Sequence, residues 1–372
     1  MSSTSSPRAT DPDPGRKPSR PGTESSTAAT DARWIHWLEE LGQEHNDLVG
    51  KKCANLGEMT KLGMRVPPGF AISVHGYERY MELTGLAGRI EAFFASLGDD
   101  LRNDIVKQME ASRVAKQMIE ATPLPAVMGE EIERHYEALC ARCGARDVPV
   151  AVRSSGAVSM PGQMETYLYV RGGADVKRRV VEVWESAFNT RAIAFRLEKG
   201  MPVHRAPIGV AVIKMVNAKS AGVVLTVSPL TGDTDRAVIE GNWGLGESVV
   251  SGEITPDHFE VEKATLAIER DVHRKLRWVV STGSGTVKAD VPAELQLEAC
   301  LTDDEIRELV RIALGVERHF GVPQDMEWVI DRDLPFPENL FWVQARPAKY
   351  TPRKKGAETD YLVDQMTRLF RR

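Results

Sequence analysis

Four side chains near the C-terminal end of the sequence could together bind a metal ion and phosphate groups. Asp325 and Glu327 alternate with other residues in one short segment, and Gln344 and Arg346 alternate in a second. Such alternation predicts strands on which the members of each pair share one face. The Asp-, Pro- and Asn-rich stretch 331–339 between the segments is typical of a hairpin loop, which would set the two polar faces side by side.

The chemistry of these four groups suits a magnesium-bound polyphosphate. Carboxylate and amide oxygens are the hard ligands that Mg²⁺ prefers, and a guanidinium forks onto two phosphate oxygens. On spacing alone, a half-solvated sheet face with an incidental ion pair explains the same residues equally well. The rest of the sequence decides between the two interpretations.

Further motifs precede this hairpin in a fixed order. They are Gly-Lys-Lys-Cys-Ala-Asn-Leu-Gly at 50–57, Val-Pro-Pro-Gly-Phe at 66–70, Val-Arg-Ser-Ser at 152–155, Ser-Pro-Leu-Thr-Gly at 228–232 and Gly-Leu-Gly-Glu-Ser-Val-Val-Ser-Gly at 244–252. Followed by Asp-x-Glu-Trp and Gln-x-Arg-Pro, this series closely resembles the N-terminal nucleotide-binding domain of phosphoenolpyruvate synthase and pyruvate phosphate dikinase. The resemblance spans about residues 47–349 and implies ATP and Mg²⁺ as ligands.

The resemblance implies which residues contact the phosphates. Lys52 stands at the family's phosphate-binding lysine, although Lys51 and Cys53 replace family glycines on either side, so Lys51 stays a competing candidate. Arg153 matches the arginine that bridges the transferred phosphates, and Arg346 is expected on the β- or γ-phosphate. With Lys52, these two arginines form the implied catalytic set.

The same resemblance implies the remaining site residues, which fall into three groups. Glu327 and Gln344 are the expected metal ligands, and Asp325 is expected to contact and orient the neighbouring site residues without touching the metal. The segment Lys214, Met215 and Val216 is expected to hold the adenine. Three residues have less defined positions: Arg191 as a further phosphate arginine, and Glu240 and Glu247 as ribose or metal-shell carboxylates or as turn and capping groups.

Composition excludes several classes of protein. The formal net charge of −5 gives no basic field for nucleic acid, and no apolar run reaches the ~20 residues of a membrane span. Residues 1–30 are rich in Ser, Thr and Pro and lack the apolar core of a secretory signal, so we expect a disordered leader. Four cysteines fit a reducing cytoplasm, and Cys140 and Cys143 lack the second ligand pair of a zinc site.

Periodicity predicts an α/β (α+β) protein of the ATP-grasp type, in which a helix-rich lobe and a strand-rich lobe clamp a nucleotide. We place the first lobe at 31–205 and the second at 206–350, with a linker and amphipathic tail at 351–372. The tail is either a partner-docking helix or a plain solvated end. An amphipathic helix is expected around Trp34–Leu41, and a loop carrying Lys52 is expected before a helix that begins near Leu56.

The motifs described above are expected to bind the phosphoryl donor, ATP, and none of them is expected to bind a phosphoryl acceptor. Full-length members of the family carry a phosphorylatable histidine downstream, and none of the eight histidines here has that context. We therefore expect a partner subunit that brings the histidine in trans. The closest fit among split relatives is the ATP-binding subunit of phenylphosphate synthase, which passes the phosphoryl group to phenol. The alternatives are a split phosphoenolpyruvate synthase, a related dikinase that phosphorylates another metabolite or a drug, and a non-catalytic ATP-sensing subunit.

Overall fold

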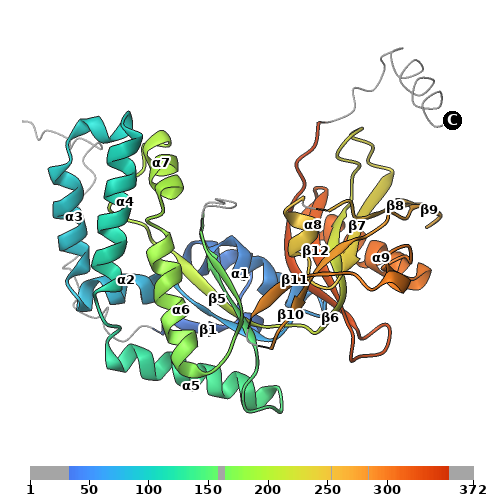
Figure 1. The fold of residues 1–372 in the computed structure, drawn as a ribbon, viewed down its shortest axis with the longest axis horizontal. Coiled ribbons are helices and arrows are strands. Elements are labelled where there is room, and N and C mark those ends of the chain that lie inside the picture. Colours follow the sequence, from blue (N-terminus) through green and yellow to red (C-terminus); the bar gives the residue numbers. More distant parts are fainter. Residues whose placement is uncertain (1–32, 158–163, 253, 284, 352–372) are drawn as a thin grey trace, which may run out of the picture. The chain divides into compact units, whose positions relative to one another are not determined.

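The computed structural model describes residues 33–157, 164–252, 254–283 and 285–351, and the part from Trp34 onward contains two antiparallel sheets and their helices (Figure 1). The expected leader at 1–30 and nearly all of the tail at 351–372 lie outside the described residues. No helix in the described part is long and apolar enough to cross a membrane.

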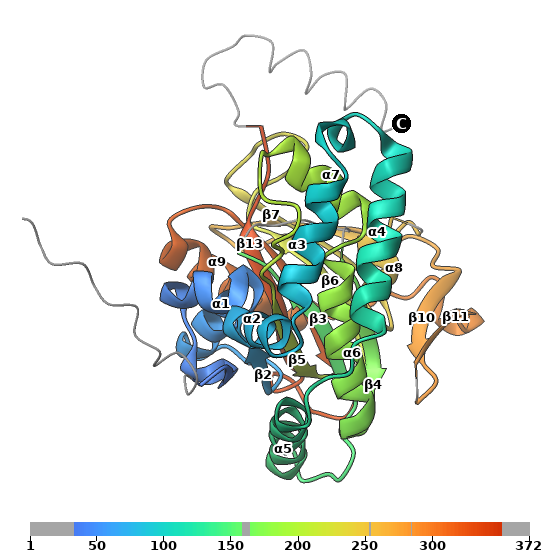
Figure 2. The ribbon, with the colours of Figure 1, turned by 90° about the vertical axis from the view of Figure 1, so that its left-hand side faces the viewer.

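The first sheet is five-stranded, in the order β1-β2-β5-β3-β4. Its strands are β1 (Ile35–Trp37), β2 (Gly69–Ile72), β3 (Val150–Ser155), β4 (Thr166–Val170) and β5 (Gly209–Lys214). Its helices are α1 (Asn46–Lys61), α2 (Val74–Leu83), α3 (Leu86–Ser96), α4 (Ile105–Glu120), α5 (Ala126–Arg142), α6 (Gly173–Ser186) and α7 (Thr190–Glu198). Figure 2 looks onto this helical side, where α3, α4 and α6 lie in front.

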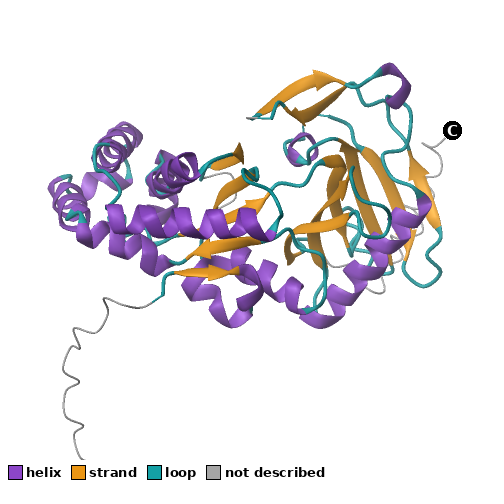
Figure 3. Cartoon of the chain, turned by 90° about the horizontal axis from the view of Figure 1, so that it is seen from below, coloured by secondary structure: helices purple, strands orange, loops and turns teal. Residues whose placement is uncertain are grey.

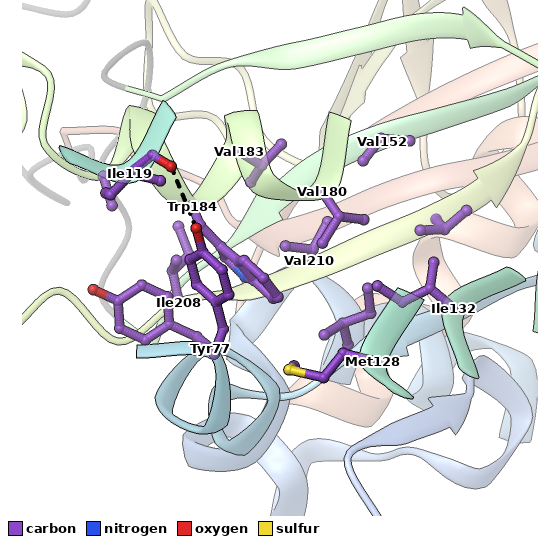
Figure 4. Packing of buried hydrophobic residues seen from close by; sticks show 14 of the residues in the cluster. Tyr77, Ile119, Met128, Ile132, Val152, Val180, Val183, Trp184, Ile208 and Val210 are labelled. Carbon is purple, nitrogen blue, oxygen red and sulfur yellow. Dashed lines mark hydrogen bonds between the residues drawn. The ribbon is translucent and has the colours of Figure 1, made fainter. Parts of the chain in front are cut away.

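The core of this lobe forms where α6 covers the sheet. Val180, Val183 and Trp184 recur at helical spacing and are fully buried, which gives α6 one apolar face. Figure 4 shows this face beside Val152 and Val210 of the sheet. The Trp184 ring stacks on Tyr80 of α2 with centroids 5.1 Å apart. Burying an aromatic ring of this size contributes a large share of the local stability.

The second sheet is six-stranded, in the order β13-β12-β6-β7-β8-β9. Its strands are β6 (Ala218–Leu225), β7 (Arg236–Trp243), β8 (Asp257–Glu262), β9 (Ile268–Asp271), β12 (Gln324–Asp331) and β13 (Leu340–Pro347), with the short helix α8 (Glu247–Val250) and the long helix α9 (Asp303–Phe320). A capping box begins α9, because the Thr302 hydroxyl accepts from the Glu305 N–H while the Glu305 carboxylate accepts from the Thr302 N–H. Figure 3 distinguishes the helices, drawn in purple, from the strands, drawn in orange.

A separate hairpin, β10 (Arg277–Ser281) and β11 (Thr286–Asp290), joins the two lobes. A fully buried ion pair fixes its base, where Lys275 Nζ lies 2.6 Å from Asp257 Oδ1. The other oxygen of Asp257 accepts from the Cys300 N–H. At the other end, Arg171 Nε, just past β4, donates to the Gly283 carbonyl at 2.8 Å.

Two expectations for the N-terminal segment are wrong. The segment around Trp34–Leu41 is a short strand followed by a 3₁₀ turn, because Ile35 and Trp37 pair with β2 instead of extending a helix. Lys52 does not lie in a loop ahead of a helix, since α1 already begins at Asn46. The helix breaks at Gly50 and resumes at once, so Lys52 occupies the first turn of its second half.

Gly50 is the backbone feature that positions this turn. Its φ is 77°, in the left-handed region that only glycine adopts freely. A Cβ at this position would lie 2.1 Å from the carbonyl oxygen of Ser155, at the end of β3. The close approach lets the Lys51 N–H donate to the Gly156 carbonyl at 3.1 Å and the Cys53 N–H donate to the Ser155 hydroxyl at 3.1 Å. The glycine therefore joins the start of this helical turn to the end of β3.

We predict that Gly50→Ala is much more damaging than Gly63→Ala, which serves as a matched control. Gly63 has the same φ of 77° but nothing within 4 Å of its added Cβ. Gly63→Ala should therefore lower the free energy of unfolding only by the backbone strain of a positive φ, about 1 kcal/mol. Gly50→Ala adds to this strain an overpacking cost of about 1–3 kcal/mol. Chemical denaturation of the two variants measures the difference. Equal losses would show that the contact with Ser155 does not constrain the turn.

Candidate functional site

The predicted C-terminal hairpin is confirmed in its strands and in the face that the four side chains share. Asp325 is paired with Arg346 and Glu327 with Gln344 across β12 and β13. The Arg346 guanidinium binds Asp325 Oδ2 through Nε at 2.9 Å and Nη2 at 2.8 Å. Asp325 therefore orients Arg346. The carboxylate of Glu327 instead contacts Gln344.

A hydrogen-bonded chain crosses from the first sheet to this hairpin. Arg153 Nη2 donates to Gln344 Oε1 at 2.7 Å, and Gln344 Nε2 donates to Glu327 Oε1 at 2.9 Å. Arg153 leaves β3 and reaches a residue 191 positions later in the chain. Its Nε is shielded from solvent and has no acceptor among the described residues. Since a buried guanidinium N–H without an acceptor is costly, this atom marks a place for an added oxygen ligand.

Lys52 supplies a third cation to the same place. Burial, helped by the positive charge of Arg153, lowers the pKa of Lys52 to about 8, while the negative charge of Glu327 acts in the opposite direction. A lysine held among cations is stabilised by an incoming anion. The neighbouring Lys51 is exposed, so its side chain faces solvent. Burial also raises the pKa of Cys53 to about 11, so its thiol stays neutral.

An apolar cavity of about 450 Å³ opens beside these charges. Its walls come from both sheets and from α8, and they include Ala151, Arg153, Thr166, Leu168, Ile213, Lys214, Met215, Val216, Ala221, Gly222, Leu245, Gly246, Glu247, Val250, Ser251, Glu327, Trp328, Val329 and Val343. A mostly apolar cavity with charged groups at one end is the usual form of a nucleotide-sized site. The arrangement can accept a flat apolar group in the cavity and anionic groups at Arg153 and Lys52.

The segment predicted to hold a base does line this cavity. Lys214 ends β5, and Met215 and Val216 follow it. Backbone bonds fix the segment, because the Lys214 N–H donates to the Pro68 carbonyl and the Met215 N–H to the Pro149 carbonyl. Glu247 also lines the cavity, from the first turn of α8.

Two predicted residues lie outside both the cavity wall and the charged cluster beside it. Glu240 shares a register row with Val223 and Glu327, so it is on the same sheet face two strands away, about 10 Å from Glu327. There it faces His258, with 3.6 Å between Oε1 and Nδ1. Arg191 is exposed at the start of α7, and no described contact joins it to the other site residues.

Sequence reasoning missed the walls that come from other strands. Thr166 and Leu168 of β4 line the cavity, as do Trp328, Val329 and Val343 of the hairpin. The alternating Thr-Tyr-Leu-Tyr-Val of β4 is a strand signal. Which of its faces meets the nucleotide depends on pairing with β3, which local pattern does not reveal.

Comparison with known proteins identifies the family. The model described as "Pyruvate phosphate dikinase, AMP/ATP-binding domain" matches residues 46–366, so the chain belongs to this family. The phosphoenolpyruvate synthase of Aeropyrum pernix is 36% identical over 357 residues, covering 87% of this chain and 43% of the relative. A probable phosphoenolpyruvate synthase of Staphylothermus marinus is 37% identical over 352 residues, covering 86% and 42%. One of Methanothermobacter thermautotrophicus is 39% identical over 323 residues, covering 85% and 46%.

The chain thus spans less than half the length of these relatives. The family supports a dikinase-type, ATP-binding role and the ATP-grasp type of fold that the sequence predicted. An apolar cavity with a cluster of cations at one end is compatible with that role.

The residues present fit a magnesium ion bound with ATP. Glu327 and the amide oxygen of Gln344 are hard donors, and Arg153 already holds that amide. Among the described residues, no group of three His, Cys, Asp or Glu side chains could hold a metal by itself. Mg²⁺ characteristically takes one or two protein ligands and completes its shell with substrate phosphates and water. Glu327 and Gln344 would hold it beside the phosphates, where it would supply charge neutralisation.

The lowered pKa of Lys52 predicts a pH dependence of ATP affinity. Lys52 is charged below its pKa of about 8 and neutral above it. Anionic phosphates bind the charged form better than the neutral form. The Kd for ATP should therefore be flat below about pH 8 and rise by up to about tenfold per pH unit above it. Lys52→Arg keeps its charge and should remove this rise. Binding titrations across this range test the effect, and an unchanged rise in Lys52→Arg would assign the titration to another group.

Proposed function

We propose that this chain is the ATP-binding, phosphoryl-donating part of a phosphoenolpyruvate synthase-type dikinase. The observation that carries the proposal is the Arg153–Gln344–Glu327 chain, which sets phosphate-binding and metal-binding groups at one end of a nucleotide-sized cavity. The names of the relatives favour pyruvate as the final acceptor. They give no support to phenol, and no described residue favours it.

In the proposed reaction the chain positions ATP for attack by a histidine. Lys52, Arg153 and Arg346 hold the phosphates, and a bound magnesium ion would neutralise part of the phosphates' negative charge. The histidine nitrogen forms a bond to the β-phosphorus, the bond from that phosphorus to the α-phosphate oxygen breaks, and AMP leaves. Water then cleaves the terminal phosphate as inorganic phosphate, which leaves phosphohistidine. This chain contributes positioning and electrostatic stabilisation.

The attacking histidine is proposed to belong to a partner subunit. None of the histidines lines the nucleotide cavity. His258, which faces Glu240 on the same sheet face, is held between two carboxylates, Glu240 and Glu260, each 3.6 Å from a ring nitrogen. These contacts raise its pKa, Glu240 having the larger effect, so it is a poor nucleophile.

The transfer assay uses β-³²P-labelled ATP, Mg²⁺, the purified chain and the histidine-carrying domain of a phosphoenolpyruvate synthase. We expect label on the histidine and AMP in equal amount, and neither when the domain is omitted. AMP formation by the chain alone would contradict the partner requirement. ATP binding without any transfer to the added domain would favour the ATP-sensing alternative.

Glu327→Ala and Arg346→Ala are expected to abolish this transfer while the fold is retained. Loss of a charged group of this kind costs about 2–5 kcal/mol, which corresponds to about 30-fold to several-thousand-fold in rate. Arg113→Ala is the matched control, because this arginine is exposed on α4 and pairs only with neighbours on its own helix. Near-normal rates in both site variants would refute their assigned roles.

A further inference from the structure

A second cavity lies behind the nucleotide cavity, between the lobes and the β10–β11 hairpin. Its volume is about 270 Å³, below the ~300–1,000 Å³ of sites for drug-sized ligands. Tyr169, Leu245, Trp278, Val279, Val280 and Arg332 are among its lining residues. The space is therefore suited to a small molecule.

Leu245 separates the two cavities and lines both. It is 7% exposed and packs in a small apolar cluster with Tyr169, Ala218 and Val279. The Leu245 N–H donates to the Val279 carbonyl at 2.9 Å, so Leu245 is held in place by a backbone hydrogen bond as well as by packing. A molecule in the second cavity would consequently occupy a place distinct from that of ATP.

Two groups of the lining are donors with spare capacity. The Trp278 indole N–H is shielded from solvent and has no acceptor among the described residues. Arg332 is exposed, has no carboxylate within ion-pairing distance in the described part of the chain, and its guanidinium makes a 3.5 Å contact with the Ala218 carbonyl. Tyr169 has a φ of 55° because Leu168 and Tyr169 form a β-bulge opposite Ala151 of β3.

The chemistry of these groups defines a ligand class. Arg332 and the Trp278 N–H are donors, which suit a carboxylate. Tyr169, Leu245, Val279 and Val280 offer aromatic and aliphatic surface to a flat apolar body. We propose that this cavity is a second ligand site that binds a small aromatic carboxylate at the same time as ATP occupies its own site.

The test uses benzoate as the probe and benzamide as its neutral isostere. Calorimetric titration of the chain should show benzoate binding, at least about tenfold weaker binding of benzamide, and unchanged benzoate binding when ATP is saturating. Arg332→Gln should weaken benzoate about tenfold or more, as expected for loss of a charged hydrogen bond. Val280→Phe adds bulk to the cavity and should block benzoate while ATP still binds.

Arg89→Gln, an exposed arginine on α3, is the matched control and should bind benzoate normally. Two results would overturn the proposal. One is the absence of benzoate binding by the unmodified chain. The other is binding that ATP displaces and that Arg332→Gln leaves unchanged, which would place the probe in the nucleotide cavity.

Discussion

The hydrogen-bonded chain from Arg153 through Gln344 to Glu327 is the interaction on which the site depends. It joins a strand of the first sheet to the edge hairpin of the second. It links the Arg153 guanidinium of the first sheet directly to the Glu327 carboxylate of the second, in addition to the apolar core that α1 shares with both sheets. A single amide achieves the connection, because its oxygen accepts from the cation and its nitrogen donates to the anion.

The rest of the site gathers positively charged side chains where solvent is partly excluded. Burial disfavours the charged form of Lys52 and repulsion by Arg153 adds to this cost, so the pKa of Lys52 is lowered. The backbone contact at Gly50 holds this lysine against the end of β3 despite the repulsion. Arg346 is stabilised differently, by the carboxylate of Asp325. ATP would relieve the repulsion, so the gathered positive charge favours an anionic ligand.

Much of the site could be predicted from the sequence, because its parts have strong local signals. Strict alternation around a loop gave the hairpin and the pairing of Glu327 with Gln344. The capping box of α9 depends only on Thr302 and Glu305. The helix expected around Trp34 was wrong because its apolar spacing fits a buried strand and turn equally well, and pairing with β2 decided the outcome. The cavity walls from β4, and the place of Glu240 outside them, depend on sheet order, which no local pattern contains.

The most direct measurement is a crystal structure of this chain with a non-hydrolysable ATP analogue and Mn²⁺ in place of Mg²⁺. We expect the base against Lys214–Val216 and the phosphates between Arg153 and Lys52. We also expect anomalous density for manganese at Glu327 and Gln344. Phosphates on Lys51, or a metal without contact to Glu327, would contradict the proposed site.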